Sequence, residues 1–247
     1  MRKMSTPLHS GRHAIHRELL KIEGNAVEMK VRLNPRAKRL IVKVHPASGE
    51  VSVVAPSRRA LGGAVEFARD QRDWIARQLA SVPVRIPLTA GAQIPVRGTP
   101  YRIVAADNLR SAVRIDDTAR EIHVGGAPEH TPRRIVDFLR KTARQDFETH
   151  VCRFAARLDV HPRRIAMHDT RSRWGSCSST RSLSFSWRLI LAPAFVLEYV
   201  AAHEVAHLRE MNHSARFWDL VKSLVGDVET PQQWLRSHGM DLHRYAA

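Results

Sequence analysis

The sequence predicts an α+β protein, in which a β-rich N-terminal region is followed by a C-terminal part built mainly on helices. Apolar and polar residues alternate with a period of two through much of the first half, whereas apolar residues recur at helical spacing from residue 131 onward. In addition, an HExxH pattern at residues 203–207 falls inside one of the predicted helices. These three observations place the informative chemistry on a helix of the C-terminal part.

The first half is predicted to hold a flexible basic leader and then a β-rich region with one helix, over residues 1–16 and 17–127. Alternating residues predict three strands of an antiparallel meander, beginning near Val27, Leu40 and Val51. A helix of about 63–80 follows, because apolar residues there line one face. A second β-rich stretch covers about 93–124, with turns centred on residues 97–100 and 116–117.

The third predicted region, residues 128–247, follows a Gly-Gly-Ala-Pro linker at residues 125–128. Thr131 is the expected N-cap of the longest helix, with Pro132 at its first helical position. Two strands come next, at residues 165–168 and 182–187. A helix from about Pro193 to Met211 then carries the HExxH pattern.

Charge and cysteine content narrow the class of protein. Lys and Arg number 40 against 24 Asp and Glu, so the formal net charge is +16. This charge allows contact with nucleic acid, but no nucleic-acid motif accompanies it, and a GC-rich genome that favours arginine codons explains it more simply. No apolar run is long enough to span a membrane. Two cysteines cannot make a disulfide framework, which favours a reducing, cytoplasmic location.

The HExxH pattern has the geometry of a metal site. His203 and His207 lie four residues apart, so on a helix their imidazoles point the same way about one turn apart. That spacing can hold one zinc ion between two nitrogens. Glu204 lies one residue round the helix, where its carboxylate can reach a water at the open coordination position.

A catalytic zinc site needs a third protein ligand, and His213 is the strongest candidate. A straight helix would carry His213 away from the metal, so the helix is expected to end after His207. Asn212 can adopt the left-handed conformation that reverses the chain, and Ser214 can cap the next helix. The rival ligands are Glu229 and, more weakly, Glu210, His168, His238 and His243.

Beyond these residues, the sequence resembles the YgjP-like metallopeptidases over about residues 20–240. The residues that carry the resemblance are the segment Arg171-Ser172-Arg173-Trp174-Gly175-Ser176-Cys177-Ser178, the strand up to Trp187, the HEVAHL segment, Asn212-His213-Ser214 and Phe217-Trp218. The resemblance implies a zincin-like catalytic domain. It also implies that His203, His207 and His213 bind one zinc ion per chain and that Glu204 is the catalytic acid/base.

The family points to hydrolysis of peptide bonds in a peptide or protein substrate. An extended peptide is expected to add to the strand 182–187, where Ser184 and Ser186 are candidate substrate-binding residues. Arg173 is a candidate for steadying the developing oxyanion, and a structural role is at least as well supported. Four further residues are interpreted as packing residues: Trp174, Trp187, Cys152 and Cys177.

Two alternative functions remain open from the sequence. The first is a nucleic-acid-associated protein, such as a SprT-like protease that acts on DNA-bound proteins, which draws on the net charge of +16. The second is a binding module that has kept a structural zinc. Glu204 argues against the second, because a purely structural zinc site does not need that residue.

Overall fold

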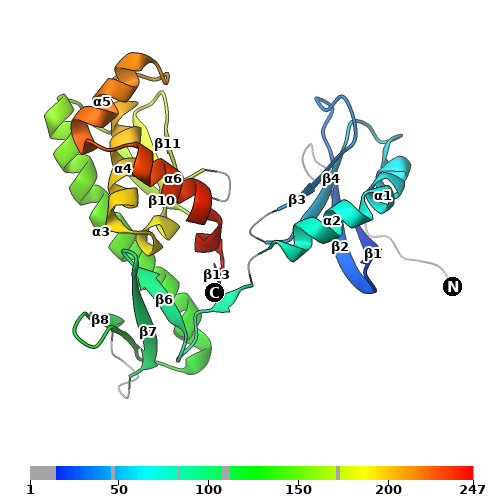
Figure 1. Ribbon diagram of the computed structural model, residues 1–247, viewed down its shortest axis with the longest axis horizontal. Helices are drawn as coiled ribbons and strands as arrows, with labels where there is room; N and C mark the ends of the chain where they lie inside the picture. Colours follow the sequence, from blue (N-terminus) through cyan, green and yellow to red (C-terminus); the bar gives the residue numbers. More distant parts are fainter. Residues whose placement is uncertain (1–14, 46–47, 83, 107–111, 171–172, 247) are drawn as a thin grey trace. The chain divides into compact units, whose positions relative to one another are not determined.

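The structure, a computed structural model, describes residues 15–45, 48–82, 84–106, 112–170 and 173–246 (Figure 1). Its internal contacts divide the chain into two compact units, Met1–Pro83 and Val84–Ala247, called here the N-terminal and C-terminal units. This division falls at a different point from the predicted boundary after residue 127. Residues 1–14 of the predicted leader lie outside the described residues, and the first strand begins at Ile15.

The N-terminal unit holds one four-stranded sheet with the order β1-β2-β4-β3. The prediction of an antiparallel meander is wrong, because β2 and β4 run parallel and β3 lies at the edge. Strand β1 was also missing from the prediction, and it forms an antiparallel pair with β2. Alternation identifies which strands have a buried face, but it does not say which strands are neighbours. The strand bounds are β1 Ile15–Ile22, β2 Asn25–Leu33, β3 Ile41–Val44 and β4 Val51–Ala55.

Two helices cover one face of this sheet. The single helix predicted for about 63–80 is in fact two, α1 (Leu61–Asp70) and α2 (Arg72–Ala80), with a break at Gln71. Alternate residues of the strands, such as Met29 and Val53, pack against Ala68 and Ile75 of the helices and are fully buried. The N-terminal unit therefore has a hydrophobic core of its own.

The C-terminal unit begins with a second mixed sheet, whose strand order is β6-β7-β9-β8. Its predicted turns are present: Arg97 and Gly98 both have positive φ between β6 and β7, and the Asp116 carboxylate accepts hydrogen bonds from the backbone of Thr118 and Ala119. The strand bounds are β6 Gln93–Val96, β7 Thr99–Ala105, β8 Arg114–Asp116 and β9 Glu121–Val124. A short parallel pair joins β5 (Ile86–Pro87) to β13 (Tyr245–Ala246).

This second sheet shares its core with the helices that follow, which is why the structural division precedes it. Ile94, Ile103 and Ile122 belong to the same buried cluster as Ile135 and Leu139 of the long helix. The predicted linker is a short connection, and it leads through a 3-10 helix, η1 (Pro128–His130), into α3 (Thr131–Leu158). Thr131 is the first residue of α3 rather than its cap, which is His130.

After α3 comes a three-stranded sheet, with β12 between a parallel β10 and an antiparallel β11. The strands are β10 Arg164–His168, β11 Gly175–Cys177 and β12 Ser182–Ser186. Trp187 was expected to end the last strand, but it begins a 3-10 helix, η2 (Trp187–Leu191). The residue is 1% exposed, which confirms the interpretation of Trp187 as a packing residue.

Between η2 and β13 the chain forms three helices and a 3-10 helix, α4 (Ala194–Ala206), α5 (Ala215–Val225), α6 (Glu229–His238) and η3 (Gly239–His243) (Figure 1). Helix α4 packs against α3, α5, α6 and β11, so it lies at the centre of the unit. None of the helices within the described residues combines the length and the apolar character needed to cross a membrane.

Arg188 of η2 ties the C-terminal segment to the rest of the unit. Its guanidinium donates two hydrogen bonds to the Asp169 carboxylate, of 2.6 and 3.2 Å, and further bonds to the carbonyls of Leu242 and Tyr245. It also lies over the Trp187 ring, 4.7 Å from the ring centre. Because the Arg188 side chain is only 11% exposed, these contacts form one partly buried network.

Candidate metal centre

Helix α4 is apolar on nearly all sides, as expected for a helix in the middle of a unit. Val196, Val200, Ala201 and Val205 are all buried, and Pro193 precedes the first turn. The helix ends at Ala206, several residues before the predicted end near Met211. His203 and Glu204 therefore lie in its last turn, and His207 is its C-cap.

The chain reverses between α4 and α5, which is needed for His213 to reach the other two histidines. The turn differs from the predicted one in the conformation of Asn212. Asn212 is not among the described residues with positive φ, so its expected left-handed conformation is wrong. Instead its side-chain oxygen accepts a hydrogen bond of 3.1 Å from the Ser214 backbone. The predicted cap is confirmed: the Ser214 hydroxyl accepts a bond from the backbone N–H of Phe217. His213 is thus held between two short-range turns.

The structure brings His203, His207 and His213 together. One potential ligand atom from each lies within 4.8 Å of the others, and the Nε2 atoms of His203 and His213 are 3.2 Å apart. Two nitrogens bound to one tetrahedral zinc ion, at about 2.1 Å each, are about 3.4 Å apart. The three imidazoles therefore fit a single metal ion.

The surroundings of the histidines favour metal binding. His207 Nδ1 lies 3.0 Å from the main-chain carbonyl of Glu210, so a proton on Nδ1 leaves Nε2 free as a ligand. The Phe217 ring stacks on His207 with the ring centres 4.4 Å apart. Burial, together with the neighbouring His207 and His213, lowers the pKa of His203 to about 4. A neutral imidazole is the form that binds a metal.

Glu204 lies beside the cluster with its side chain turned to the interior. The residue is 5% exposed, and burial raises the pKa of its carboxyl to about 8, against the opposing charge of Arg173. Burial of Cys177 itself, together with the charge of Glu204, raises the pKa of the Cys177 thiol to about 11. Cys177 is therefore a packed thiol near the carboxyl rather than a reactive one.

The rival ligands lie elsewhere. Within the described residues, the three histidines form the one group of three or more potential ligands that converges. Glu229 begins α6, and His243 is buried against the Trp174 ring. The main-chain carbonyl of Glu210 is the hydrogen-bond partner of the His207 ring, a role that does not depend on the Glu210 side chain. The remaining rivals are outside the group as well: His168 in β10 and His238 in α6.

The strand expected to receive substrate, β12, lies in the middle of its sheet. Strand β12, which carries Ser184 and Ser186, has a neighbour on each side, so its main-chain groups are already paired. Ser186 is also fully buried. Strand β11, which packs beside α4, pairs only with β12 among the described strands and is therefore an edge. Arg173 lies exposed just before this edge, whereas Arg171 and Ser172 lie outside the described residues.

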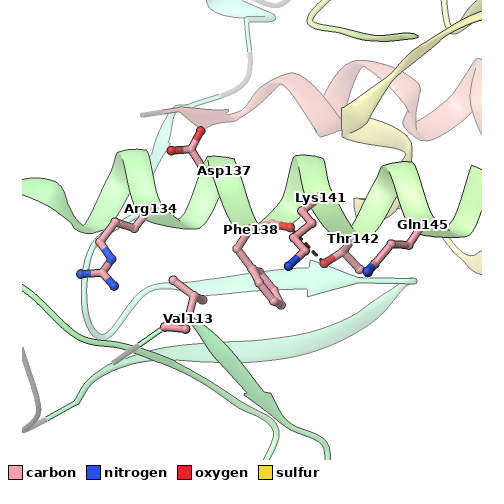
Figure 2. Close-up of a pocket in the computed structure, with 8 residues that line it drawn as sticks. Val113, Arg134, Asp137, Phe138, Lys141, Thr142 and Gln145 are labelled. Carbon is pink, nitrogen blue, oxygen red and sulfur yellow. Dashed lines mark hydrogen bonds between the residues drawn. The ribbon is translucent and has the colours of Figure 1, made fainter. Parts of the chain in front are cut away.

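A pocket on α3 lies apart from this chemistry. It has a volume of about 450 Å³, and Figure 2 shows Val113 and Phe138 beside the charged side chains of Arg134 and Lys141. None of the candidate ligands or catalytic residues lines it.

Three histidines that fit one metal ion, with a buried carboxyl next to them, are the arrangement typical of the site of a metal-dependent hydrolase. The comparison with protein families agrees: the model of the YgjP-like metallopeptidase domain matches residues 38–238. The chain belongs to the YgjP-like metallopeptidase family.

Two further comparisons add little to this assignment. Among solved structures, the chain is similar to the metallopeptidase zymogen abylysin from Pyrococcus abyssi, with a TM-score of 0.34 and 17% sequence identity. That similarity covers 41% of this chain and 99% of abylysin. The comparison with curated proteins found no match.

Proposed function

We propose that this protein is a zinc-dependent metallopeptidase that hydrolyses peptide bonds. The observation that carries the proposal is the convergence of His203, His207 and His213 beside the buried Glu204. Three neutral nitrogen ligands suit zinc and leave a fourth position for water or substrate. When bound, a zinc ion at this position supplies a Lewis acid that lowers the pKa of water toward 7 and polarises a carbonyl.

Glu204 is assigned the role of general base and then general acid. Its carboxylate takes a proton from the attacking water and delivers that proton to the leaving amine. Without a metal ion, burial raises the pKa of Glu204 to about 8. A dication held by the three histidines would lower this pKa and favour the carboxylate, which is the form that accepts the proton from water.

The free edge of β11 is the proposed substrate position, in place of β12. A peptide that adds to residues 175–177 by main-chain hydrogen bonds would lie along the strand that packs beside α4. Arg173 lies two residues before this edge strand and is exposed, so its guanidinium is available to a substrate carbonyl or to the developing oxyanion. We propose a cytoplasmic location, since both cysteines are free thiols.

The test separates metal binding from catalysis. The metal content per chain and the cleavage of a peptide library are measured for the wild type, Glu204→Gln, His213→Ala and the control His238→Ala. We expect one zinc in the wild type and in Glu204→Gln, loss of zinc in His213→Ala, and no change in His238→Ala. Glu204→Gln should lose about 10²–10⁴-fold in kcat/KM.

Two results would contradict the proposal. A wild type purified without chelator that carries no metal would exclude the metallopeptidase mechanism. A metal-loaded wild type whose cleavage is unchanged by Glu204→Gln would favour the alternative of a binding module with a structural zinc.

Nucleic-acid binding is a second candidate function, supported by the charges on the N-terminal sheet. Met29 and Val31 face the core, so Lys30 lies on the sheet face away from the helices. The strand register places Arg17 opposite Lys30, and both Lys30 and Lys43 opposite Ser52. Two of these cations already pair with carboxylates of the same sheet, Lys30 with Glu50 at 2.8 Å and Arg17 with Glu28 at 3.5 Å. We propose that the row of Arg17, Lys30 and Lys43 contacts the phosphates of duplex DNA, which compete with these two carboxylates.

A charge-reversal pair tests the row. Arg17→Glu/Lys43→Glu is compared with Arg69→Glu/Arg77→Glu, which changes exposed arginines on α1 and α2 by the same charge. Binding of a labelled 20-base-pair duplex is followed by anisotropy at 50 and 200 mM salt. We expect salt-sensitive binding by the wild type that the first pair weakens by about tenfold or more and the second does not. If both double variants lost the same DNA affinity, the binding would depend on net charge alone, and the proposed row would be contradicted.

A further inference from the structure

Gly175 of β11 and Glu204 of α4 approach so closely that no side chain fits between them. An ideal Cβ built on Gly175 would lie 2.5 Å from Oε1 of Glu204, 2.7 Å from its Cγ and 2.9 Å from its Cδ. Real Cβ atoms essentially never come within 3.0 Å of another heavy atom. Any residue with a Cβ at position 175 therefore requires the Glu204 side chain to move.

The requirement for glycine here is steric and not conformational. Gly175 is not among the described glycines with positive φ, so its backbone conformation is open to other residues. A glycine inside a strand normally weakens that strand, because it loses more backbone entropy and has no side chain to pack. In the absence of Glu204, alanine would be the more stable residue at this position.

Glu204 cannot avoid the added Cβ by turning its carboxylate alone. The Cγ atom is among the three atoms too close to it, so the change must begin nearer the backbone of α4. The surroundings leave little room for this, since Glu204 is 5% exposed and both Val205 and Ala201 next to it are buried.

The strand register shows which face of β11 the carboxyl lies on. Gly175 pairs with Phe185 and Cys177 with Leu183, and both partners are buried. Ser176 points to the opposite face and pairs with Ser184. Glu204 acts electrostatically on Cys177 as well as contacting Gly175, so its carboxyl lies along the inward face of this strand.

We propose that Gly175 is a positioning residue for catalysis: by lacking a side chain, it lets the Glu204 carboxyl lie against the edge strand, beside the three histidines. This rests on the proposed peptidase function. It explains a glycine at a strand position where glycine itself is unfavourable.

The first test is a double-mutant cycle on stability, which does not depend on activity. Urea unfolding of the full chain is measured for the wild type, Gly175→Ala, Glu204→Ala and the double variant. We expect Gly175→Ala to lower the urea midpoint of the wild type, and to leave it unchanged or raise it when Glu204 is already alanine. Ser176→Ala, on the other face of the same strand, is the control and should behave alike in both backgrounds.

The second test is on catalysis and metal content. Gly175→Ala should keep its zinc and lose about 10²-fold or more in kcat, with a much smaller change in KM. In a background of Glu204→Asp, whose side chain is one methylene shorter, Gly175→Ala should cost clearly less than in the wild type. If the role of Gly175 were merely structural, Gly175→Ala would lower the amount of folded enzyme equally in the wild type and in Glu204→Asp.

Each outcome bears on the proposal separately from the peptidase function. An additive stability cycle, or full kcat in Gly175→Ala, would overturn the positioning role. If the wild type cleaves no peptide, the peptidase function fails, while the stability cycle still decides whether Gly175 makes room for Glu204. If Gly175→Ala does not fold, the double variant should fold, and its failure as well would overturn the contact argument.

Discussion

Replacing Arg188 by alanine tests how firmly the C-terminal segment is held to the rest of its unit. The change removes two hydrogen bonds to Asp169 and leaves the carbonyls of Leu242 and Tyr245 without their donor. Breaking a largely buried ion pair by removing one partner costs about 3–5 kcal/mol. Asp169 is 41% exposed and can regain water, so the lower end of that range is expected for the free energy of unfolding.

The assay is urea unfolding followed by tryptophan fluorescence, with the transitions of the two compact units fitted separately. Arg144→Ala is the matched control, because Arg144 pairs with Glu148 on the surface of α3 and should lose less than about 1 kcal/mol. Arg188→Lys keeps the charge but not the two-pronged contact, and should fall in between. A loss below about 1 kcal/mol in Arg188→Ala would refute the reasoning.

The same network predicts a dependence on pH. Burial alone would raise the pKa of Asp169, but the hydrogen bond and charge of Arg188 outweigh it and hold this pKa below its usual value. A lowered pKa in the folded state contributes stability above the unfolded pKa, near 3.9, and that contribution is lost as the pH falls through the folded value. The difference in stability between the wild type and Arg188→Ala should therefore shrink below about pH 4.

Three further predictions concern the site. With a pKa of about 11, the Cys177 thiol is only about 0.1% ionised at pH 8, so a thiol reagent should modify the exposed Cys152 first and Cys152→Ser should abolish the fast phase. Ser214→Ala should cost about 1 kcal/mol by removing the cap of α5, and zinc titration should show weaker binding because the turn holding the third histidine loosens. Phe217→Ala should cost about 3–5 kcal/mol in urea unfolding and also weaken zinc binding, because the fully buried Phe217 ring packs on His207.

Much of the fold was predictable from local patterns. The alternation of apolar residues identified β2, β3 and β4, and helical periodicity identified α3 and α4. The pairing of those strands was not predictable, because the parallel contact between β2 and β4 depends on how the chain crosses between them. For the same reason the central place of β12 was missed, and with it the identity of the edge strand.

The candidate site divides in a similar way. Because residues four apart lie on the same face of a helix, the convergence of His203 and His207, with Glu204 beside them, could be predicted from their spacing. The turn that brings in His213 was predicted, but with the wrong conformation at Asn212. Gly175 was visible in the sequence, yet its importance comes from a residue 29 positions later, and no local pattern reports a contact between two distant elements.

The orientation of His207 has a consequence for which substitutions the site can tolerate. Its Nδ1 atom meets a main-chain carbonyl, at Glu210, and not a side chain. Every amino acid offers that same oxygen, so the chemical identity of residue 210 is free to change while the histidine keeps its partner. What must be preserved is the length and path of the chain from Ala206 to His213, and a single inserted or deleted residue in that turn would do more harm than any replacement of the Glu210 side chain.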